Sequence, residues 1–290
     1  MKFQIGSKWV GQGEPVFVVA EACSNWVGED LDEGHKKALR LIEGAAKAGA
    51  DAIKFQLLRA DKLYVPGELR EKVRRYELPC EWLPELSNRA HELGLAFICT
   101  PLYLGAVGEL LPYVDAYKIA SGDMLWFPLW EDVIIKTLTP IIVSTGAATQ
   151  SEVTELQTWL DSFALPGYSV MMLHCVSAYP AHSWIMNLRA MPQTGWLFGL
   201  SDHSCDPMVA SMAVALGASI IEVHFAQSDS DVEAWHSLIG VEGLGAYVRL
   251  IRRAERILGD GVKRPMPCEE SERLWARRGE DGLRPKEEVR

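Results

Sequence analysis

Residues 49–56 read GADAIKFQ, and this stretch decides the fold. In an extended strand Ala52, Lys54 and Gln56 share one face, while Ile53 and Phe55 share the other. The two large apolar side chains must face covering helices, which turns Lys54 toward the inside of a closed sheet. The stretch therefore predicts a strand of a parallel barrel with a lysine in its interior.

Similar short apolar runs alternate with helical patterns along the whole chain, which is typical of β/α units and a parallel sheet. The expected strands are residues 16–21, 51–56, 95–100, 115–120, 140–144, 169–175, 196–201 and 219–225. Eight such units in about 260 residues match the usual size of a (β/α)8 TIM barrel, a fold of the α/β class. A doubly wound sheet normally has fewer strands and a glycine-rich phosphate turn, which we do not find.

The helices between the strands have signals of their own. Apolar and small residues recur every three to four positions over residues 31–49, and Thr149-x-x-Glu152 is a capping box at a helix start. A last helix is expected over residues 244–258. These signals place helices where a barrel requires them.

Two segments depart from the compact pattern. Residues 57–78 form a long charged connection after the second strand, where a lid or active-site loop would lie. Residues 259–290 are rich in arginine, glutamate and turn formers. We expect a catalytic barrel over residues 1–258 and a charged, partly disordered tail over residues 259–290.

Charge and hydropathy exclude several classes of partner. The 290 residues carry a formal net charge of -10, so nucleic acid and anionic membranes would be repelled by the average surface. No uncharged apolar stretch approaches the roughly 20 residues that span a bilayer, and the N-terminus lacks the apolar core of a signal peptide. We expect a cytoplasmic protein that holds any anionic ligand in a local pocket.

The six cysteines show no C-x-x-C pair, and several lie inside apolar runs. This arrangement favours buried free thiols in a reducing compartment over a disulfide framework.

Several other charged residues share the inward orientation of Lys54. Lys118 lies between Ala116 and Ala120, Glu222 and His224 share one face of the eighth strand, and Glu21 ends the first strand. Charges in a low-dielectric interior are costly unless they are paired or bind a ligand. The set indicates a site for a charged ligand, although a purely structural network of ion pairs is the alternative.

Three histidines lie at the ends of successive strands, where neighbouring strands bring them close together. They are His174, His203 and His224. We expect His203 and His224 to bind a metal ion and His174 to support them or face the substrate. The turns containing Ser121, Ser144 and Ser201 can offer hydroxyl and backbone N–H groups to a phosphate or carboxylate.

In this order the strings AEACSN, GADAIKFQ, FICTP, YKIASGD, IIVSTGAAT, LHCVSAYPA, NLRAMP, GLSDHS and GASIIEVHF resemble the sialic acid synthase family. That family includes the N-acetylneuraminate, legionaminate and pseudaminate synthases, and the resemblance covers roughly residues 16–226. It implies a condensation in which C3 of phosphoenolpyruvate attacks an aldehyde carbonyl, water adds at C2, and phosphate leaves.

The resemblance also implies roles for individual residues. His203 and His224 would bind Mn2+ or Mg2+, while Glu21 and Asp123 would be the catalytic carboxylates, with Asp123 activating the water. The implied substrate-binding residues are Lys54, Gln56, Thr100, Lys118, Ser121, Ser144, Ser177, Tyr179, Ser201 and His236.

The chain departs from the family pattern on the acceptor side. Residues 25–28 read NWVG where the family usually has N-H-x-G, so Trp26 replaces an imidazole. The family stretch after EVHF is shortened to SDSDVEAWHSL, of which only His236 is carried over. The antifreeze-like domain that normally follows the barrel has no room in these residues. An acceptor other than N-acetylmannosamine is therefore a real alternative, and a homodimer is expected only from barrel-to-barrel contact.

Two other functions stay open at the level of sequence. Lys54 or Lys118 could be the nucleophile of a Schiff-base aldolase, because a desolvated lysine at a strand end can attack a carbonyl. A barrel that binds its ligand without turnover, as a sensor or scaffold, is the non-enzymatic alternative.

Overall fold

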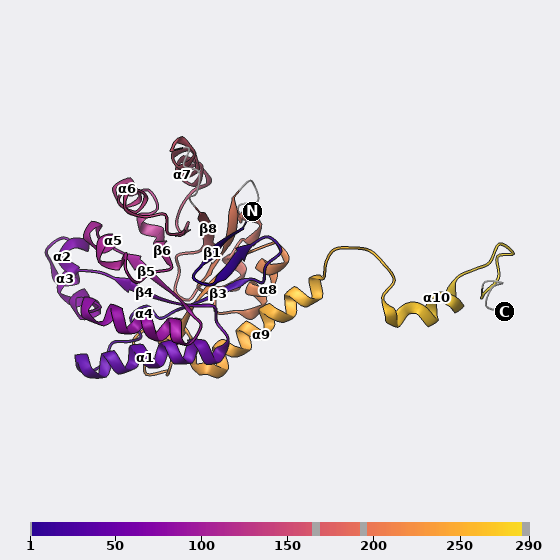
Figure 1. Cartoon of the computed structure of the whole chain (residues 1–290), viewed down its shortest axis with the longest axis horizontal. Helices are drawn as coiled ribbons and strands as arrows, with labels where there is room; N and C mark the ends of the chain where they lie inside the picture. The colour runs from indigo at the N-terminus through magenta and orange to yellow at the C-terminus, as the bar shows by residue number, and fades with distance from the viewer. Residues whose placement is uncertain (1, 164–168, 192–195, 286–290) are drawn as a thin grey trace. The chain divides into compact units, whose positions relative to one another are not determined.

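The computed structural model describes residues 2–163, 169–191 and 196–285. Its central feature is a barrel of parallel strands (Figure 1). The pairing of β9 with β10 closes the ring. The barrel strands are β3 (Phe17–Glu21), β4 (Ala52–Leu57), β5 (Ala96–Pro101), β6 (Ala116–Ile119), β7 (Ile141–Ser144), β8 (Val170–Cys175), β9 (Leu197–Asp202) and β10 (Ile220–Ala226). The predicted (β/α)8 barrel is confirmed, and every expected strand agrees with the structure to within one residue at each end.

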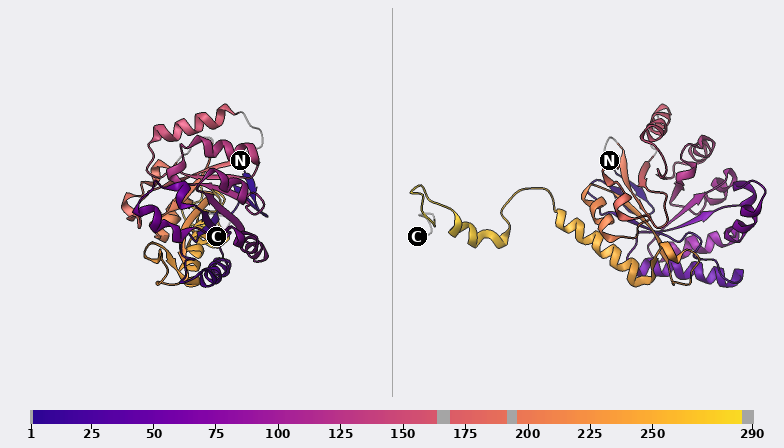
Figure 2. Two further views of the ribbon diagram at one scale, coloured as in Figure 1. Left: turned by 90° about the vertical axis from the view of Figure 1, so that its left-hand side faces the viewer. Right: turned by 180° about the vertical axis from the view of Figure 1, so that it is seen from behind.

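Helices surround the strands on the outside of the barrel, as the two additional views show (Figure 2). They are α1 (Leu31–Ala48), α2 (Ala60–Leu63), α3 (Glu68–Val73), α4 (Leu83–Glu92), α5 (Leu104–Leu110), α6 (Phe127–Lys136), α7 (Gln150–Ser162), α8 (Pro207–Ala215) and α9 (Gly240–Leu258). The described residues between β8 and β9 form short 3-10 turns, at 183–185 and 188–190, in place of an α-helix.

The helix ends follow from local chemistry. The Asp30 side chain accepts the Glu33 N–H at 2.8 Å, and α1 stops at Gly49, whose φ of 85° suits glycine. Thr149 and Glu152 form the predicted capping box at the start of α7. The last helix begins at Gly240, four residues before the expected start at 244.

The lower half of the barrel interior is apolar and is closed by an N-terminal hairpin. Strands β1 (Lys2–Ile5) and β2 (Lys8–Gly11) are antiparallel and joined by a two-residue turn. Phe3, Ile5 and Val10 belong to the same apolar cluster as interior residues such as Phe17 and Ile142. This plug was not predicted from sequence, and it leaves only the opposite, carboxyl end of the strands for a ligand.

The expected loop over residues 57–78 contains two short helices, α2 and α3, and a 3-10 turn. The chain divides into two compact units, residues 1–255 and 256–290. In the second unit the structure describes a 3-10 turn, Pro267–Glu269, and a short helix, α10 (Glu270–Ala276), neither of which was predicted from the sequence.

All six cysteines are free thiols, as expected. Among the described residues, no helix is both long enough and apolar enough to cross a membrane.

Candidate active site

The upper half of the barrel interior is polar, because most of the strands carry a polar residue two positions after an apolar interior one. Val19 precedes Glu21, Ala52 precedes Lys54, and Ile142 precedes Ser144 on the same faces. The polar layer consists of Glu21, Lys54, Thr100, Lys118, Ser144, Ser201 and Glu222, each at most 5% exposed. Alternation along the strands therefore places the predicted charges inside, at the carboxyl ends.

Lys54 is the centre of an ion-pair network. Its Nζ atom contacts Glu21 Oε2 directly and lies 3.6 Å from Glu222 Oε1. Burial opposes the charged form, but the two carboxylates outweigh it and raise the pKa of Lys54. For Glu222, burial is likewise outweighed by Lys118 and Lys54, which hold its pKa below the usual range. Lys54 and Glu222 are therefore a charged pair.

Lys118 is the second buried lysine, and it has a different environment. Its Nζ atom donates to the Ile119 carbonyl at 3.1 Å, and no carboxylate of the described chain lies within 4 Å of it. Burial lowers the pKa of Lys118, an effect that Glu222 partly offsets. This ammonium group is available to pair with an anionic ligand. The structural-network alternative therefore accounts for Lys54 better than for Lys118.

Hydroxyl groups without protein partners surround the two lysines. Thr100 Oγ1 and Ser144 Oγ are buried and have no hydrogen-bond partner. Ser121 Oγ accepts the Gly146 N–H at 3.0 Å, and a side chain at Gly146 would collide with the hydroxyls of Ser121 and Ser177. Buried polar atoms without partners are uncommon, so these hydroxyls point to a polar ligand.

Three histidines gather on the other side of the same cavity, around Tyr179. The ring centroids of His203 and His224 are 5.4 Å apart, and those of His224 and His236 are 4.6 Å apart. His203 Nδ1 donates to the Val176 carbonyl at 2.8 Å, which leaves its Nε2 as an acceptor. The Tyr179 ring lies 4.2 Å from that of His203.

The donor atoms fit a divalent cation. Burial lowers the pKa values of His203 and His224, and it lowers that of His236 to about 4, so all three rings are neutral near pH 7. Neutral imidazole is the form that binds metal ions. The buried atoms His224 Nδ1 and Glu233 Oε2 have no hydrogen-bond partner. The residues present therefore suit a metal ion on the histidine side.

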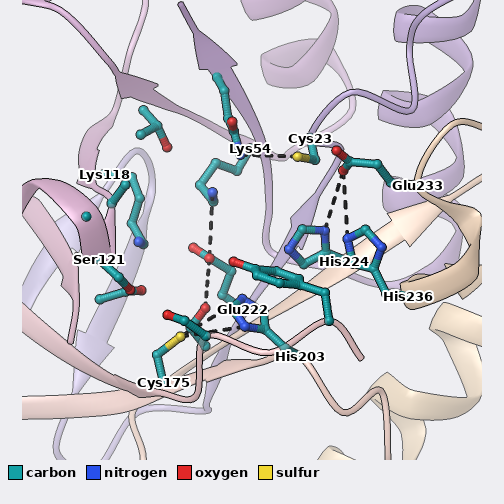
Figure 3. A pocket seen from close by; sticks show the side chains of 18 of the residues that line it. Cys23, Lys54, Lys118, Ser121, Cys175, His203, Glu222, His224, Glu233 and His236 are labelled. Carbon is teal, nitrogen blue, oxygen red and sulfur yellow. Dashed lines mark hydrogen bonds and ion pairs between the residues drawn. The ribbon is translucent and has the colours of Figure 1, made fainter. Parts of the chain in front are cut away.

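The lysine, hydroxyl and histidine groups line one cavity of about 450 Å3 (Figure 3). In this view Lys118 and Ser121 lie across the cavity from His224 and His236. The residues predicted from sequence that line it are Lys54, Gln56, Thr100, Lys118, Ser121, Ser144, Ser177, Tyr179, Ser201, His203, His224 and His236. Every predicted substrate and metal residue is thus brought to one place.

The two predicted catalytic carboxylates do not line this cavity. Glu21 lies beneath it, 1% exposed and paired with Lys54. Asp123 is in a 3-10 turn beside the cavity, and burial raises its pKa, although Lys118 acts in the opposite direction. Burial also raises the pKa of Glu21. Their catalytic roles stay predictions.

Two further residues that were considered from the sequence lie away from the cavity. Trp26 does not close the acceptor side of the cavity, because it is 4% exposed and packs in the outer core, edge-on against Trp82. His174 does not face the substrate, because it alternates with Leu173 and Cys175, and its Nε2 lies 2.7 Å from the Met186 carbonyl. Strand alternation alone identifies the outward orientation of His174.

Sequence reasoning missed several side chains that line the cavity, among them Cys23, Cys175, Glu233 and Trp235. Cys175 could have been found, because it lies on the inward face of β8, two residues after Leu173. Glu222, which the sequence analysis placed inward without a role in the site, also lines the cavity. Cys23, Glu233 and Trp235 lie in segments that follow strands, where no periodic pattern indicates orientation.

Comparison with known proteins places these residues in a family context. The NeuB family matches residues 41–263 of the chain. An uncharacterised protein of Methanocaldococcus jannaschii is 38% identical over 284 residues, which cover 96% of this chain and 82% of that protein. The pseudaminic acid synthase of Campylobacter jejuni is 35% identical over 272 residues, covering 85% of this chain and 76% of the synthase.

Solved structures include a similar barrel. The N-acetylneuraminic acid (sialic acid) synthetase of Leptospira borgpetersenii superposes with a TM-score of 0.84 at 28% identity. The superposition covers 94% of this chain and 95% of that chain. The resemblance read from the sequence motifs is confirmed.

Proposed function

This chain belongs to the NeuB family, and on that premise we propose that it condenses phosphoenolpyruvate with the aldehyde group of an amino sugar. A new bond joins C3 of phosphoenolpyruvate to the aldehyde carbon, water adds at C2, and phosphate departs. The products are a 2-keto-3-deoxy sugar acid and inorganic phosphate. The enzyme is accordingly a transferase of the sialic acid synthase type.

One observation carries this proposal: two lysines and several unpartnered hydroxyls are buried in one cavity beside neutral histidines. The Lys118 ammonium and the hydroxyls of Thr100 and Ser144 would bind the phosphate and carboxylate of phosphoenolpyruvate. Lys54 lies beneath them, held charged by Glu21 and Glu222, which also offset its charge. The Lys118 ammonium would attract an anion locally, although the chain as a whole has a net charge of -10.

On the opposite side, His203 and His224 would hold Mn2+ or Mg2+. When bound, such a cation polarises the acceptor carbonyl as a Lewis acid. Tyr179, whose ring lies 4.2 Å from that of His203, would hold the acceptor against the histidines. Asp123 would take a proton from the water that adds at C2, and its raised pKa makes it a stronger base than an exposed aspartate.

The acceptor class rests on the relatives. The names pseudaminic acid synthase and sialic acid synthetase indicate amino-sugar aldehydes, such as N-acetylmannosamine or a relative of it. A cavity of about 450 Å3 is within the range of small-molecule sites, roughly 300–1,000 Å3. A cytoplasmic location and a homodimer stay predictions, which fractionation and light scattering would check.

The test is phosphate release by the full chain, supplied with phosphoenolpyruvate, Mn2+ and a panel of amino-sugar aldehydes. We expect acceptor-dependent release, and we expect Lys118→Met to weaken phosphoenolpyruvate binding by about 100-fold or more. Lys36→Met is the matched control, because Lys36 is exposed on α1. Tight phosphoenolpyruvate binding without release, across the whole panel and with Mn2+ present, would instead favour a sensor or scaffold.

A Schiff-base aldolase is the second candidate, because burial lowers the pKa of Lys118 and increases the fraction of neutral amine. Borohydride reduction in the presence of pyruvate separates the two reactions. Only the aldolase would become covalently labelled at Lys118, so an unlabelled protein that releases phosphate eliminates this alternative.

A further inference from the structure

We propose that Asn25, Lys37 and Asp231 are positioning residues that hold residues 227–237, here called the β10 segment, in the form that lines the cavity. The three side chains lie outside the cavity lining and act through the backbone of the segment. The inference rests on the proposed function, in which the histidine side of the cavity receives the acceptor.

The β10 segment forms part of the cavity wall on the histidine side. Glu233, Trp235 and His236 line the cavity, and in the close-up Glu233 and His236 lie beside His224 (Figure 3). Residues 227–231 read QSDSD, so no apolar side chain anchors the start of the segment to the core. Its position must therefore depend on polar contacts.

Asp231 fixes the first half of the segment. Its Oδ2 atom accepts the N–H groups of Gln227 at 2.9 Å and Ser228 at 3.1 Å. Its Oδ1 atom pairs with Lys37 Nζ at 2.6 Å, and the Asp231 side chain is only 2% exposed. Lys37 also donates to the Val27 carbonyl at 3.1 Å. This lysine of α1 therefore ties the β10 segment to the turn that follows β3.

Asn25 fixes the second half of the segment from that same turn. Its Oδ1 atom accepts the Glu233 N–H at 2.8 Å. Its Nδ2 atom donates to the Phe225 carbonyl at 3.0 Å and to Ser237 Oγ at 3.3 Å. Asn25 is fully buried, so both ends of one amide are used without competition from solvent. The contact to the backbone of Glu233 sets the place from which that side chain enters the cavity.

Close packing does not replace these contacts. A further cavity, of about 200 Å3, lies between the β10 segment and α1, and Asn25, Lys37, Gln227 and Asp231 are among the residues that line it. A segment that borders empty space can move when a polar contact is removed, because few neighbouring atoms resist the movement.

Hydrogen exchange of backbone amides tests the contacts in the absence of substrate and metal. We expect the N–H groups of Gln227, Ser228 and Glu233 to be protected in the wild type. Asp231→Ala should raise the exchange rates of Gln227 and Ser228 by about 10-fold, the effect of losing one hydrogen bond. Asn25→Ala should do the same for Glu233.

Steady-state kinetics test the effect on the reaction. Lys37→Met should raise KM for the acceptor by about 10- to 100-fold, because groups that are displaced by less than 1 Å bind poorly. It should leave KM for phosphoenolpyruvate unchanged, because Lys118 lies across the cavity from the histidines. Lys37→Arg, which keeps the charge, should restore the acceptor KM. Lys36→Met on α1 and Asp229→Asn in the β10 segment are the matched controls, because both side chains are exposed.

Two kinetic results would overturn the inference. One is an unchanged acceptor KM in Lys37→Met, and the other is an equal rise in both KM values, which would indicate general damage to the site. Rapid exchange of the Glu233 N–H in the wild type would overturn it as well.

Thermal unfolding checks that each variant is folded. Lys37→Met keeps the test decisive if Asn25→Ala does not fold, because Lys37 is on the outer helix α1 and its side chain is 16% exposed. Exchange needs no turnover. A wild type that shows the expected protection, but releases no phosphate with any acceptor, therefore contradicts the proposed function alone.

Discussion

The charge of each buried side chain determines what it can bind in the candidate site. Lys54 and Lys118 lie in the same polar layer, yet their pKa values shift in opposite directions, because only Lys54 has carboxylates beside it. Burial lowers the pKa values of His203 and His224, which favours the neutral imidazoles that a metal ion would require. The sequence indicated these residue types and their orientation, but the pairing of charges depends on distances across the barrel.

His236 gives a residue-scale prediction about stability and pH. Burial, with a further contribution from His203, lowers its pKa from 6.5 to about 4, so between these values the unfolded chain binds a proton that the folded chain does not. The free energy of unfolding of metal-free protein should therefore fall as the pH drops through this window. One proton contributes a slope of about 1.4 kcal/mol per pH unit.

Urea unfolding at several pH values between 4 and 6.5 measures this slope. His236→Asn should flatten the dependence by about one proton. Trp235→Phe, a change in the aromatic neighbour whose ring lies 4.2 Å from that of His236, should leave the slope as it is. An unchanged slope in His236→Asn would show that this imidazole is protonated in the folded state.

At the scale of elements, the strands could be predicted from the sequence, whereas the segments that follow them could not. Alternation along the strands predicted every strand and the inward position of Lys54, Lys118 and Glu222. It also identifies Cys175, which was overlooked. The segments after the strands have no such period, so Cys23 and Glu233 were missed. The hairpin was missed as well, although Gly6-Ser7 between two alternating runs is a recognisable hairpin signal.

The turn after β7 supplies the element-scale prediction. A Cβ at Gly146 would lie 2.8 Å from Ser121 Oγ and closer still to Ser177 Oγ, so Gly146→Ala must displace both hydroxyls. We expect kcat/KM for phosphoenolpyruvate to fall by about 100-fold, because small displacements of positioning groups have effects of this size. The loss of stability should be about 1–3 kcal/mol.

Steady-state kinetics and denaturant unfolding measure the two effects of Gly146→Ala. Gly108→Ala in α5 is the control, since the nearest atom to its added methyl group is Lys136 Nζ at 3.9 Å. Wild-type kinetics in Gly146→Ala would mean that the Ser121 and Ser177 hydroxyls do not contact the substrate.

At the scale of the whole molecule, the two ends of the barrel have separate roles, one in stability and the other in ligand binding. The apolar cluster and the hairpin fill the amino end of the barrel, and the polar layer and cavity occupy the carboxyl end. Function in TIM barrels is generally found at the carboxyl end, whereas the opposite end contributes stability.

This separation predicts that damage to the hairpin leaves catalysis intact. Ile5 is fully buried, so Ile5→Ala should lower the free energy of unfolding by about 2–5 kcal/mol. The kcat/KM of the folded protein should not change, because Ile5 packs at the end opposite the cavity. Gln4→Ala, on the exposed face of the same strand, should change neither quantity. A fall in kcat/KM for Ile5→Ala at temperatures where the protein is folded would contradict the separation.

The sequence by itself determined the barrel, the order of its strands and the residues that face its interior. The reason is local: a strand alternates its side chains with a period of two, and this period is visible in the sequence. Only the tertiary structure decided which of these groups pair and which stay available to a ligand. Cys23 and Glu233 are far apart in the chain and come together because β3 and β10 are neighbours in a closed ring. Ring closure is a property of the whole chain, so no local pattern contains it.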